Sequence, residues 1–331
     1  MNPIWKDFIL TLGETPASAV DFDLQDDNNL GVTLYSGRAY TRPGQTIPQA
    51  RINDIVASQL RRGLTIIGET DVPYFFAFIS VVGEGVIYEY EEEFFADWSY
   101  DPGFDVDTDN LNQPICDILL PGQWVPCTMR NSTTASFLIT HTEAEAGDFN
   151  EDFNHDFLIS GDVVDEETVA NGGVLQTAWF SLRNYPTATK VEVDGRTYRV
   201  GGGCRQYALY YVNAYGGWDT FPVRANTQES DAVTHHTTER EYNNSTPSAR
   251  GRVNFVNELQ HKYVFHSHPL TLEQSLRMHH LLNSPCVYLH DIVANVIRPV
   301  VLTGSTTEYK RDGGLYQYTI EAELAQDRMR R

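Results

Sequence analysis

The clearest structural signal in the chain is the sequence VEVDGRTYRV, residues 191–200. Its central pair, Asp194-Gly195, stands between two runs in which apolar and polar residues alternate, as they do in strands with one buried face. A two-residue type I′ turn needs a positive φ angle at both central residues, and Asp-Gly meets this requirement at low cost. The stretch therefore predicts an antiparallel hairpin in which Asp194 and Gly195 have a structural role.

Strand signals recur along the rest of the chain, because short runs rich in β-branched and aromatic residues alternate with turn residues. The clearest of these runs are Val32–Tyr40, Tyr74–Val82, Val86–Glu92, Ala135–His141, Val174–Leu182, Tyr207–Ala214 and Leu315–Leu324. In the last run, apolar residues occupy every second position from Tyr316 to Leu324. The sequence thus predicts an all-β protein, built mainly of antiparallel β-sandwich-like domains with one or two short helices.

Two segments have helical features. Thr271–Asn283 begins with a residue that can cap a helix and has Gln274 three positions later, as in a capping box. Its expected apolar side consists of Leu272, Leu276, Leu281 and Leu282. The weaker candidate is Ile52–Arg62, which could equally form a strand.

Charge is distributed unevenly over the 331 residues, which have a net charge of -21. Residues 1–165 hold 7 basic and 28 acidic residues, whereas residues 166–331 hold 17 of each. Binding to phosphate groups needs clustered Lys and Arg, so we expect no specific nucleic-acid binding and no attachment to an anionic membrane. The acidic half could face DNA that passes through a channel without sticking to it, or could simply keep an outer surface soluble.

Composition shifts suggest the division of the chain. We expect an acidic N-terminal β-domain over residues 1–145, an acidic linker or surface excursion over 146–171, and a β-rich C-terminal domain over 172–331. Within the last domain, the polar stretch 226–248 is interpreted as a long loop, mobile until a partner binds it. As a candidate interface arm, this loop offers His235, His236, Glu239, Arg240, Glu241 and Tyr242.

No stretch reaches 18 consecutive apolar residues, and the start of the chain lacks a basic segment followed by an apolar core. We therefore expect neither a membrane span nor a secretory signal, and synthesis in a cytoplasm. The cysteines form no CxxC pair and no disulfide framework, and are interpreted as reduced packing residues. They are Cys116, Cys127, Cys204 and Cys286.

Metal sites are suggested only weakly. Residues 105–110 resemble the start of a calcium loop, but Asn110 and Cys116 stand where an EF-hand has Gly and Glu, so a solvated acidic loop is the preferred interpretation. A zinc site could use histidines, but no HExxH motif occurs and we interpret them as surface or interface residues. The histidines concerned are His235, His236, His266, His268, His279 and His280. We expect no metal and no cofactor.

Catalytic motifs are absent from the sequence. No GxSxG occurs, and the glycine-rich stretch 201–204 is not followed by the GK[ST] of a phosphate loop. Paired carboxylates such as those of 91–93 arise by chance in an acidic chain, so a glycosidase pair stays an open but unsupported alternative. We expect a protein that is not an enzyme and has no catalytic residues.

The most distinctive segment is YYVNAYGGWDTF, residues 210–221. It predicts a strand that ends in a Gly-Gly turn, with Trp218 packed back and Asp219 capping loop amides. The motif residues are Tyr215, Gly216, Gly217, Trp218 and Asp219. The alternative is an aromatic platform for sugar or protein contact, to which Trp98, Tyr100, Tyr215 and Trp218 could contribute.

Several segments together carry a resemblance. They are YSGRAY (35–40) with INDI (52–55), WSYD (98–101), YVNAYGGWD (211–219), and SPCVYL (284–289) running on to PVVLT (299–303). Their order and spacing resemble virion structural proteins of the tail and neck region in crAss-like and related bacteriophages of Bacteroidales gut bacteria. The segment 211–219 is the most specific part of this resemblance.

The resemblance implies an all-β subunit that assembles into a homo-oligomeric ring around a symmetry axis and has no enzymatic residues. Its implied partners are copies of itself and other phage tail or neck proteins. Its implied location is the virion, and the host cytoplasm during assembly. A competing interpretation is a carbohydrate-binding or host-receptor-binding β-sandwich module.

Overall fold

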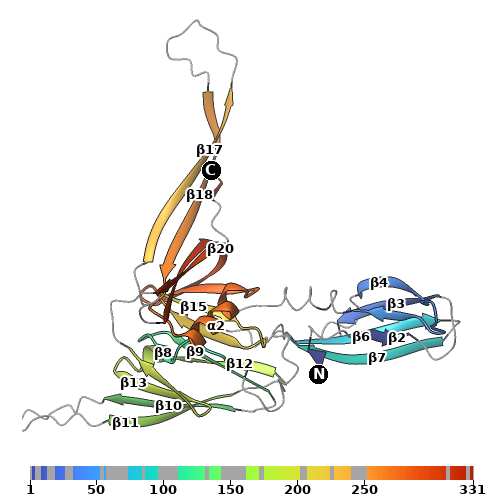
Figure 1. Cartoon of the computed structure of the whole chain (residues 1–331), viewed down its shortest axis with the longest axis horizontal. Coiled ribbons are helices and arrows are strands. Elements are labelled where there is room, and N and C mark those ends of the chain that lie inside the picture. The colour runs from blue at the N-terminus through green and yellow to red at the C-terminus, as the bar shows by residue number, and fades with distance from the viewer. Residues whose placement is uncertain are drawn as a thin grey trace, which may run out of the picture.

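The structure is a computed structural model of the chain, shown as a ribbon in Figure 1. The residues that it describes are 2–3, 9–12, 19–26, 33–52, 56, 74–83, 86–95, 111–130, 134–142, 162–170, 175–201, 207–223, 227–239, 252–310, 314–325 and 329–330. Within them the protein is mostly strand, with antiparallel sheets and one α-helix, which confirms the predicted all-β class.

The strands of residues 2–95 pair only with one another and form two small sheets. The first, in the order β1-β7-β6-β3-β4, contains β1 (Asn2–Pro3), β3 (Ala19–Asp26), β4 (Thr33–Tyr40), β6 (Tyr74–Gly83) and β7 (Val86–Phe95). The second pairs β2 (Ile9–Thr11) with β5 (Gln49–Arg51). In β3 the buried residues Val20, Phe22 and Leu24 alternate with Asp21 and Asp23, the period-two pattern of a strand with one apolar face.

The main body begins with a two-sheet sandwich. One sheet has the order β11-β10-β13-β14-β8 and the other pairs β12 with β9. Their bounds are β8 (Ile118–Leu119), β9 (Trp124–Arg130), β10 (Thr134–Thr142), β11 (Asp162–Ala170), β12 (Leu175–Ser181), β13 (Ala188–Val193) and β14 (Arg196–Val200), with a 3₁₀ helix η2 (Leu182–Asn184) after β12. Phe137 and Val191 of the first sheet share a core with Val125 and Phe180, and the rings of Phe137 and Phe180 stack at 5.0 Å.

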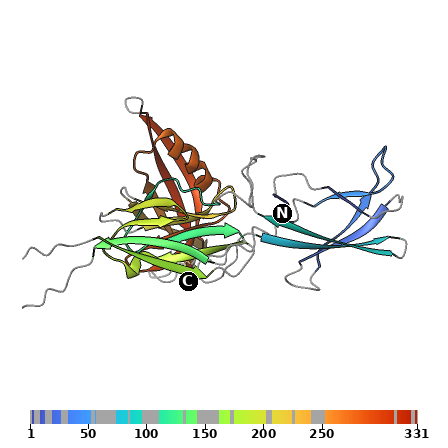
Figure 2. The ribbon, with the colours of Figure 1, turned by 90° about the horizontal axis from the view of Figure 1, so that it is seen from below.

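A larger sheet completes the body in the order β16-β15-β19-β20-β21-β18-β17, with β22 also paired to β18. Its strands are β15 (Tyr207–Val212), β16 (Trp218–Pro222), β17 (Thr227–Glu239), β18 (Arg252–His266), β19 (Val287–Asp291), β20 (Val296–Lys310), β21 (Leu315–Leu324) and β22 (Met329–Arg330). The helix α2 (Leu272–Leu282) packs on one face of this sheet through Met278 and Leu281. Figures 1 and 2 show the helix beside the large sheet.

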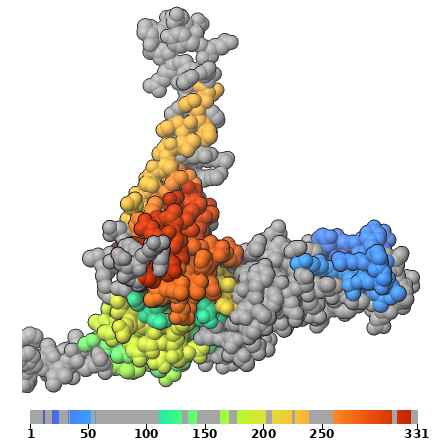
Figure 3. Space-filling view, in the orientation of Figure 1, coloured from blue at the N-terminus to red at the C-terminus, as the bar shows by residue number. Residues whose placement is uncertain are grey.

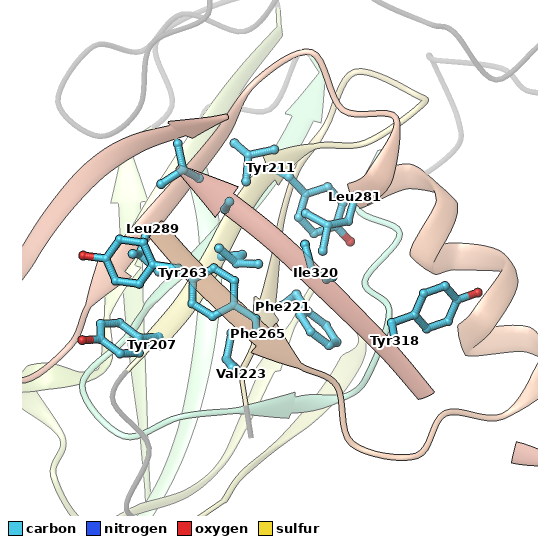
Figure 4. Packing of buried hydrophobic residues seen from close by; sticks show 14 of the residues in the cluster. Tyr207, Tyr211, Phe221, Val223, Tyr263, Phe265, Leu281, Leu289, Tyr318 and Ile320 are labelled. Atoms are coloured by element: carbon cyan, nitrogen blue, oxygen red, sulfur yellow. The ribbon is translucent and has the colours of Figure 1, made fainter. Parts of the chain in front are cut away.

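All six residues of β15 are buried, so the large sheet is covered on both sides at this strand. Tyr207, Leu209 and Tyr211 point into the core that includes α2, which Figure 4 shows from close by. Tyr210 and Val212 belong to a second core, which Trp124 and Trp179 of the β9–β12 sheet help to form. The body is therefore a stack of three sheets and a helix, joined through β15.

The hairpin over residues 191–200 is confirmed. β13 and β14 pair antiparallel, Val193 faces Arg196, and the turn residues have the positive φ angles expected for type I′, 47° at Asp194 and 72° at Gly195.

The helix over 271–283 is also confirmed, with the capping box of Thr271 and Gln274. Its buried face differs from the expected one: Leu272 and Leu276 are 57% and 60% exposed, and Ser275, Met278 and Leu281 are buried instead. Of the second predicted helix, Ile52–Arg62, only Ile52 and Val56 are described, and the Val56 amide donates to the Ile52 carbonyl as in a helical turn.

Residues 146–171 do not separate two domains, and of the two alternatives expected for them, a linker or a surface excursion, the strand pairing fits the second. β10 precedes the acidic stretch and pairs with β11, which lies inside it, and with β13, which follows it. The chain leaves β10 at Thr142 and returns at Asp162, directly opposite, so the stretch is an excursion from one sheet. Acidic residues gather where a chain is exposed to solvent. An edge strand and its connection are exposed, as a linker is, so an acidic composition does not distinguish them. The change from one set of sheets to the next occurs between β7 and β8.

The predicted long loop 226–248 is wrong over most of its length. Residues 227–239 form β17, which pairs with β18 along thirteen positions from Thr227↔Phe265 to Glu239↔Arg252. Figure 1 shows this hairpin standing away from the body. Because β17 is polar on both faces, it lacks the alternation by which strands are recognised.

We expect Gly195→Val to lower the free energy of unfolding by about 1–3 kcal/mol, because a β-branched residue is strained at positive φ. Gly195→Asn is the matched control, since Asn tolerates the left-handed region. Urea denaturation of the three proteins measures the effect. Equal stability of the Val variant and the unaltered protein would contradict a type I′ turn.

Candidate functional site

The segment 213–219 forms a tight loop between β15 and β16. The Asn213 Oδ1 atom accepts hydrogen bonds from the backbone amides of Tyr215 at 2.9 Å and Gly217 at 3.0 Å. Gly216 has a φ of 86°, and the Asn213 amide donates to the Gly217 carbonyl at 2.8 Å. The predicted Gly-Gly turn is thus confirmed, and Asn213 holds it closed.

Asp219 lies at the centre of a buried polar network and is 1% exposed. Its carboxylate accepts hydrogen bonds from the Gln113 amide at 2.9 Å, from Asn213 Nδ2 at 2.7 Å and from Asn112 Nδ2 at 3.3 Å. Asp219 thus caps one backbone amide, that of Gln113, whereas the amides of its own loop bond to Asn213. The capped segment lies more than a hundred residues earlier in the chain.

Asn112 extends this network along β16 and into two other strands, β9 and β12. Its Nδ2 atom donates to the Trp218 carbonyl at 2.6 Å, and its Oδ1 atom accepts from the Thr128 amide at 2.7 Å. The Thr128 hydroxyl accepts from the Trp218 amide at 3.0 Å and lies 2.9 Å from the hydroxyl of Thr177. Sequence reasoning missed Asn112, Thr128 and Thr177, because single polar residues without a local motif do not reveal a distant partner.

Burial raises the pKa of Asp219 to about 6, although its three hydrogen-bond donors and the nearby charge of Arg196 act in the opposite direction. At neutral pH the group is thus a carboxylate held by amide donors. It has almost no contact with solvent, so its position suits structural cross-linking of β16 to the 111–114 segment and does not suit contact with a substrate.

The predicted aromatic platform cannot include Trp218, its main residue. Trp218 is 1% exposed and packs against Trp179 at 5.8 Å, so it cannot stack on a sugar. Tyr215 is partly buried, with its ring 5.8 Å from that of His280. Trp98 and Tyr100 lie outside the described residues.

The candidate interface arm is a β-hairpin. On β17 every residue from Val233 to Thr238 is exposed, including His235 and His236, which face Asn257 and Val256 of β18. Glu239 ends the strand, while Arg240, Glu241 and Tyr242 lie outside the described residues. Figure 3 shows the arm projecting from the packed body.

The histidines proposed as zinc ligands are dispersed. His266 on β18 contacts the Thr319 hydroxyl at 3.0 Å, His268 stacks on Phe221 at 6.0 Å, and His279 and His280 lie on α2. Within the described ranges no group of three or more His, Cys, Asp or Glu could hold a metal ion. The calcium-like stretch 105–110 lies outside these ranges.

The cysteines lie in apolar surroundings. Cys116 and Cys127 are 3% and 1% exposed, Cys286 is partly buried, and Cys204 is outside the described part of the chain. Burial raises the pKa of Cys127 to about 12 and that of Cys286 to about 11, so both are protonated thiols at neutral pH. Such thiols are poor nucleophiles.

No protein-family model matches this chain, and no curated protein matches its sequence. Among the described helical residues, no helix has the length and apolar character needed to cross a membrane.

We expect Gly217→Ala to destabilise the protein by about 1–3 kcal/mol, as overpacking does in well-packed sites. A Cβ atom at Gly217 would lie 2.4 Å from the backbone oxygen of Leu111, and the backbone on both sides is fixed by the Asp219 network. Gly304→Ala is the control, because its Cβ atom would meet Glu321 Oε2 at an ordinary 3.5 Å. Thermal unfolding measures both, and equal losses for the two variants would contradict the close approach.

We expect the stability that Asp219 confers to depend on pH. Because its folded-state pKa of about 6 lies above the unfolded value of 3.8, the folded chain keeps a proton that the unfolded chain has lost between these pH values. The unfolding free energy of the unaltered protein, measured relative to Asp219→Asn, should fall as pH rises from about 4 to about 6 and stay constant above about pH 7. Urea denaturation across this range tests the sign, and a rise with pH would show that the amide donors outweigh desolvation.

Proposed function

We propose that the protein is a structural component of a bacteriophage virion, which assembles into a homo-oligomeric ring in the tail or neck region and contacts other tail or neck proteins. The observation that carries this proposal is the exposed β17–β18 arm. The resemblance of the segments 35–55, 98–101, 211–219 and 284–303 to virion proteins of crAss-like phages gives the proposal its direction.

The arm has the features of an element that binds a neighbour. A two-stranded ribbon is marginally stable by itself, so a long one gains from a partner. Val233, an apolar residue at 49% exposure, lies next to the polar exposed residues Thr234, His235 and His236. This mixture suits a hydrogen-bonded interface with some apolar contact better than it suits a dry core.

The distribution of polar chemistry supports the same function. The buried polar residues Asn112, Thr128, Asn213 and Asp219 bond to one another and to backbone inside the body. The hydrogen-bonding groups of these side chains hold the layers of the body together. What the described surface offers instead is strand edges and the arm, which are the elements with which β-rich subunits join one another.

The test compares the full-length protein with a variant in which Asn-Gly replaces residues 235–257. Thr234 and Glu258 face each other in the ladder, so a two-residue turn can close the shortened hairpin, and β22 keeps its pairing with β18. We expect the unaltered protein to form rings in negative-stain images and by light scattering. The variant should keep its melting temperature and lose mass by light scattering.

The matched control replaces residues 143–161 by Asn-Gly, since Thr142 and Asp162 are also directly opposed. This variant should assemble like the unaltered protein. A monomeric unaltered protein would contradict the ring, and normal assembly of the arm variant would remove the arm from the interface. Binding to a glycan array by a monomer would favour the carbohydrate-binding or receptor-binding alternative.

A further inference from the structure

An open groove lies on the face of the β11-β10-β13-β14-β8 sheet that points away from the sandwich core. It has a volume of about 650 Å³. Its lining consists of Ile118, Thr189, Lys190, Thr197, Arg199, Val200 and Gly201. Thr189 is the extra residue where the β10–β13 register shifts, and its hydroxyl donates to the Thr140 carbonyl at 3.2 Å.

Two cations lie side by side in the lining of this groove. Lys190 and Arg199 are direct partners in the β13–β14 ladder, a placement that costs stability when both residues are charged. The Lys190 amine contacts the Glu192 carboxylate at 3.6 Å, whereas no described carboxylate forms an ion pair with Arg199. Arg199 is exposed, in a chain whose net charge is -21. The groove is therefore a basic site that can bind a further anionic group.

The opposite edge of the same sheet has the complementary character. Among the described strands β11 pairs only with β10, so no described strand covers its outer edge, and Figure 1 shows β11 on the far side of the sheet from β8. Val164 is 61% exposed. Glu166 lies two positions after Val164 and therefore on the same face of β11. The strand registers place Lys190 and Arg199 on this face of the sheet as well.

We propose that the groove receives the β11 edge of a second copy of this chain, so that copies join head to tail. In this contact Val164 of one copy packs on Ile118 of the next, while Glu166 approaches Lys190 and Arg199. Complementary surfaces on opposite edges of one sheet make a heterologous contact, which repeats from copy to copy and gives a ring when the rotation between copies closes. The proposal rests on the self-assembly proposed above and adds a second contact between copies to that of the arm.

A phosphate-bearing ligand is the other anion that could enter the groove. The charge of the whole chain opposes the approach of a polyanion, whereas an edge strand of the same chain carries its acidic side chains next to an apolar one. Two cations are also few for a nucleic-acid site, in which several Lys and Arg usually follow the backbone. The second copy is therefore the occupant that fits both the charge and the apolar lining.

The experiment measures mass by light scattering for full-length variants at about 0.1 M and about 0.5 M salt. Lys190→Glu/Arg199→Glu reverses the groove and should elute as a monomer of 37.5 kDa. Arg183→Glu/Arg298→Glu changes the charge equally at exposed positions outside the groove and should assemble normally. Association of the unaltered protein should weaken at the higher salt concentration. Thermal unfolding confirms that each variant is folded.

The decisive step is a mixture. Glu166→Lys reverses the charge that the β11 edge brings to the groove, and this variant should also be monomeric alone. Mixed in equal amounts with the groove variant, it restores opposite charges at every contact, so the mass should rise above that of either variant.

An oligomeric unaltered protein whose mass the groove variant leaves unchanged would overturn this inference and leave the proposed ring intact. A monomeric unaltered protein would overturn both. Two monomeric variants that fail to associate when mixed would overturn the groove–edge contact. If the groove variant keeps its mass but loses binding to inorganic polyphosphate, the occupant is a phosphate ligand.

Discussion

The body of this protein depends on β15, a strand whose side chains are buried on both faces. A sheet of this kind usually keeps one face in contact with solvent, and two-sided burial requires a second layer that fits closely on each side. Here Tyr211 faces the core beneath α2, while Tyr210 packs edge-on against Trp179 at 5.5 Å. The Tyr210 hydroxyl accepts from the Trp124 amide at 2.8 Å, so even its polar atom is used between layers. Neither layer can shift without opening a gap on one side of this strand.

The Asp219 network fixes how those layers meet. Apolar packing alone tolerates small slides of one sheet over another, but a buried carboxylate with three donors permits one arrangement, because an unpaired donor or acceptor at this depth is costly. Gly217 contributes to this fixed arrangement, because its lack of a side chain lets the Leu111 carbonyl approach. The loop between β15 and β16 is therefore distinctive in sequence because it is a junction between layers of the body.

The parts of the fold that could be predicted are those in which local chemistry and final environment agree. β21 has one buried face and alternates accordingly, and Asp194-Gly195 defines its own turn. β17 could not be recognised, because an exposed ribbon has no buried face to impose a pattern. For the acidic stretch around β11 the sequence left a linker and a surface excursion equally open, since charge indicates exposure to solvent and not how the strands are connected. The partners of Asp219 could not be predicted for a third reason. The contacts of Asn112 and Thr128 depend on how distant segments meet, and no motif near either residue in the chain indicates these contacts.

The junction between Asn112 and Asp219 also bears on the speed of folding. Its contacts join residues more than a hundred positions apart, and β15 finds its neighbour β19 only after α2 and the whole β17–β18 ribbon have been made. Chains dominated by such long-range pairings close large loops before they gain any contact energy, and so fold slowly. During that delay the Trp and Tyr side chains of the future interior face water, where collisions with other chains lead to aggregation. The high negative charge of the first half makes nascent chains repel one another, which opposes such collisions while the core is still incomplete.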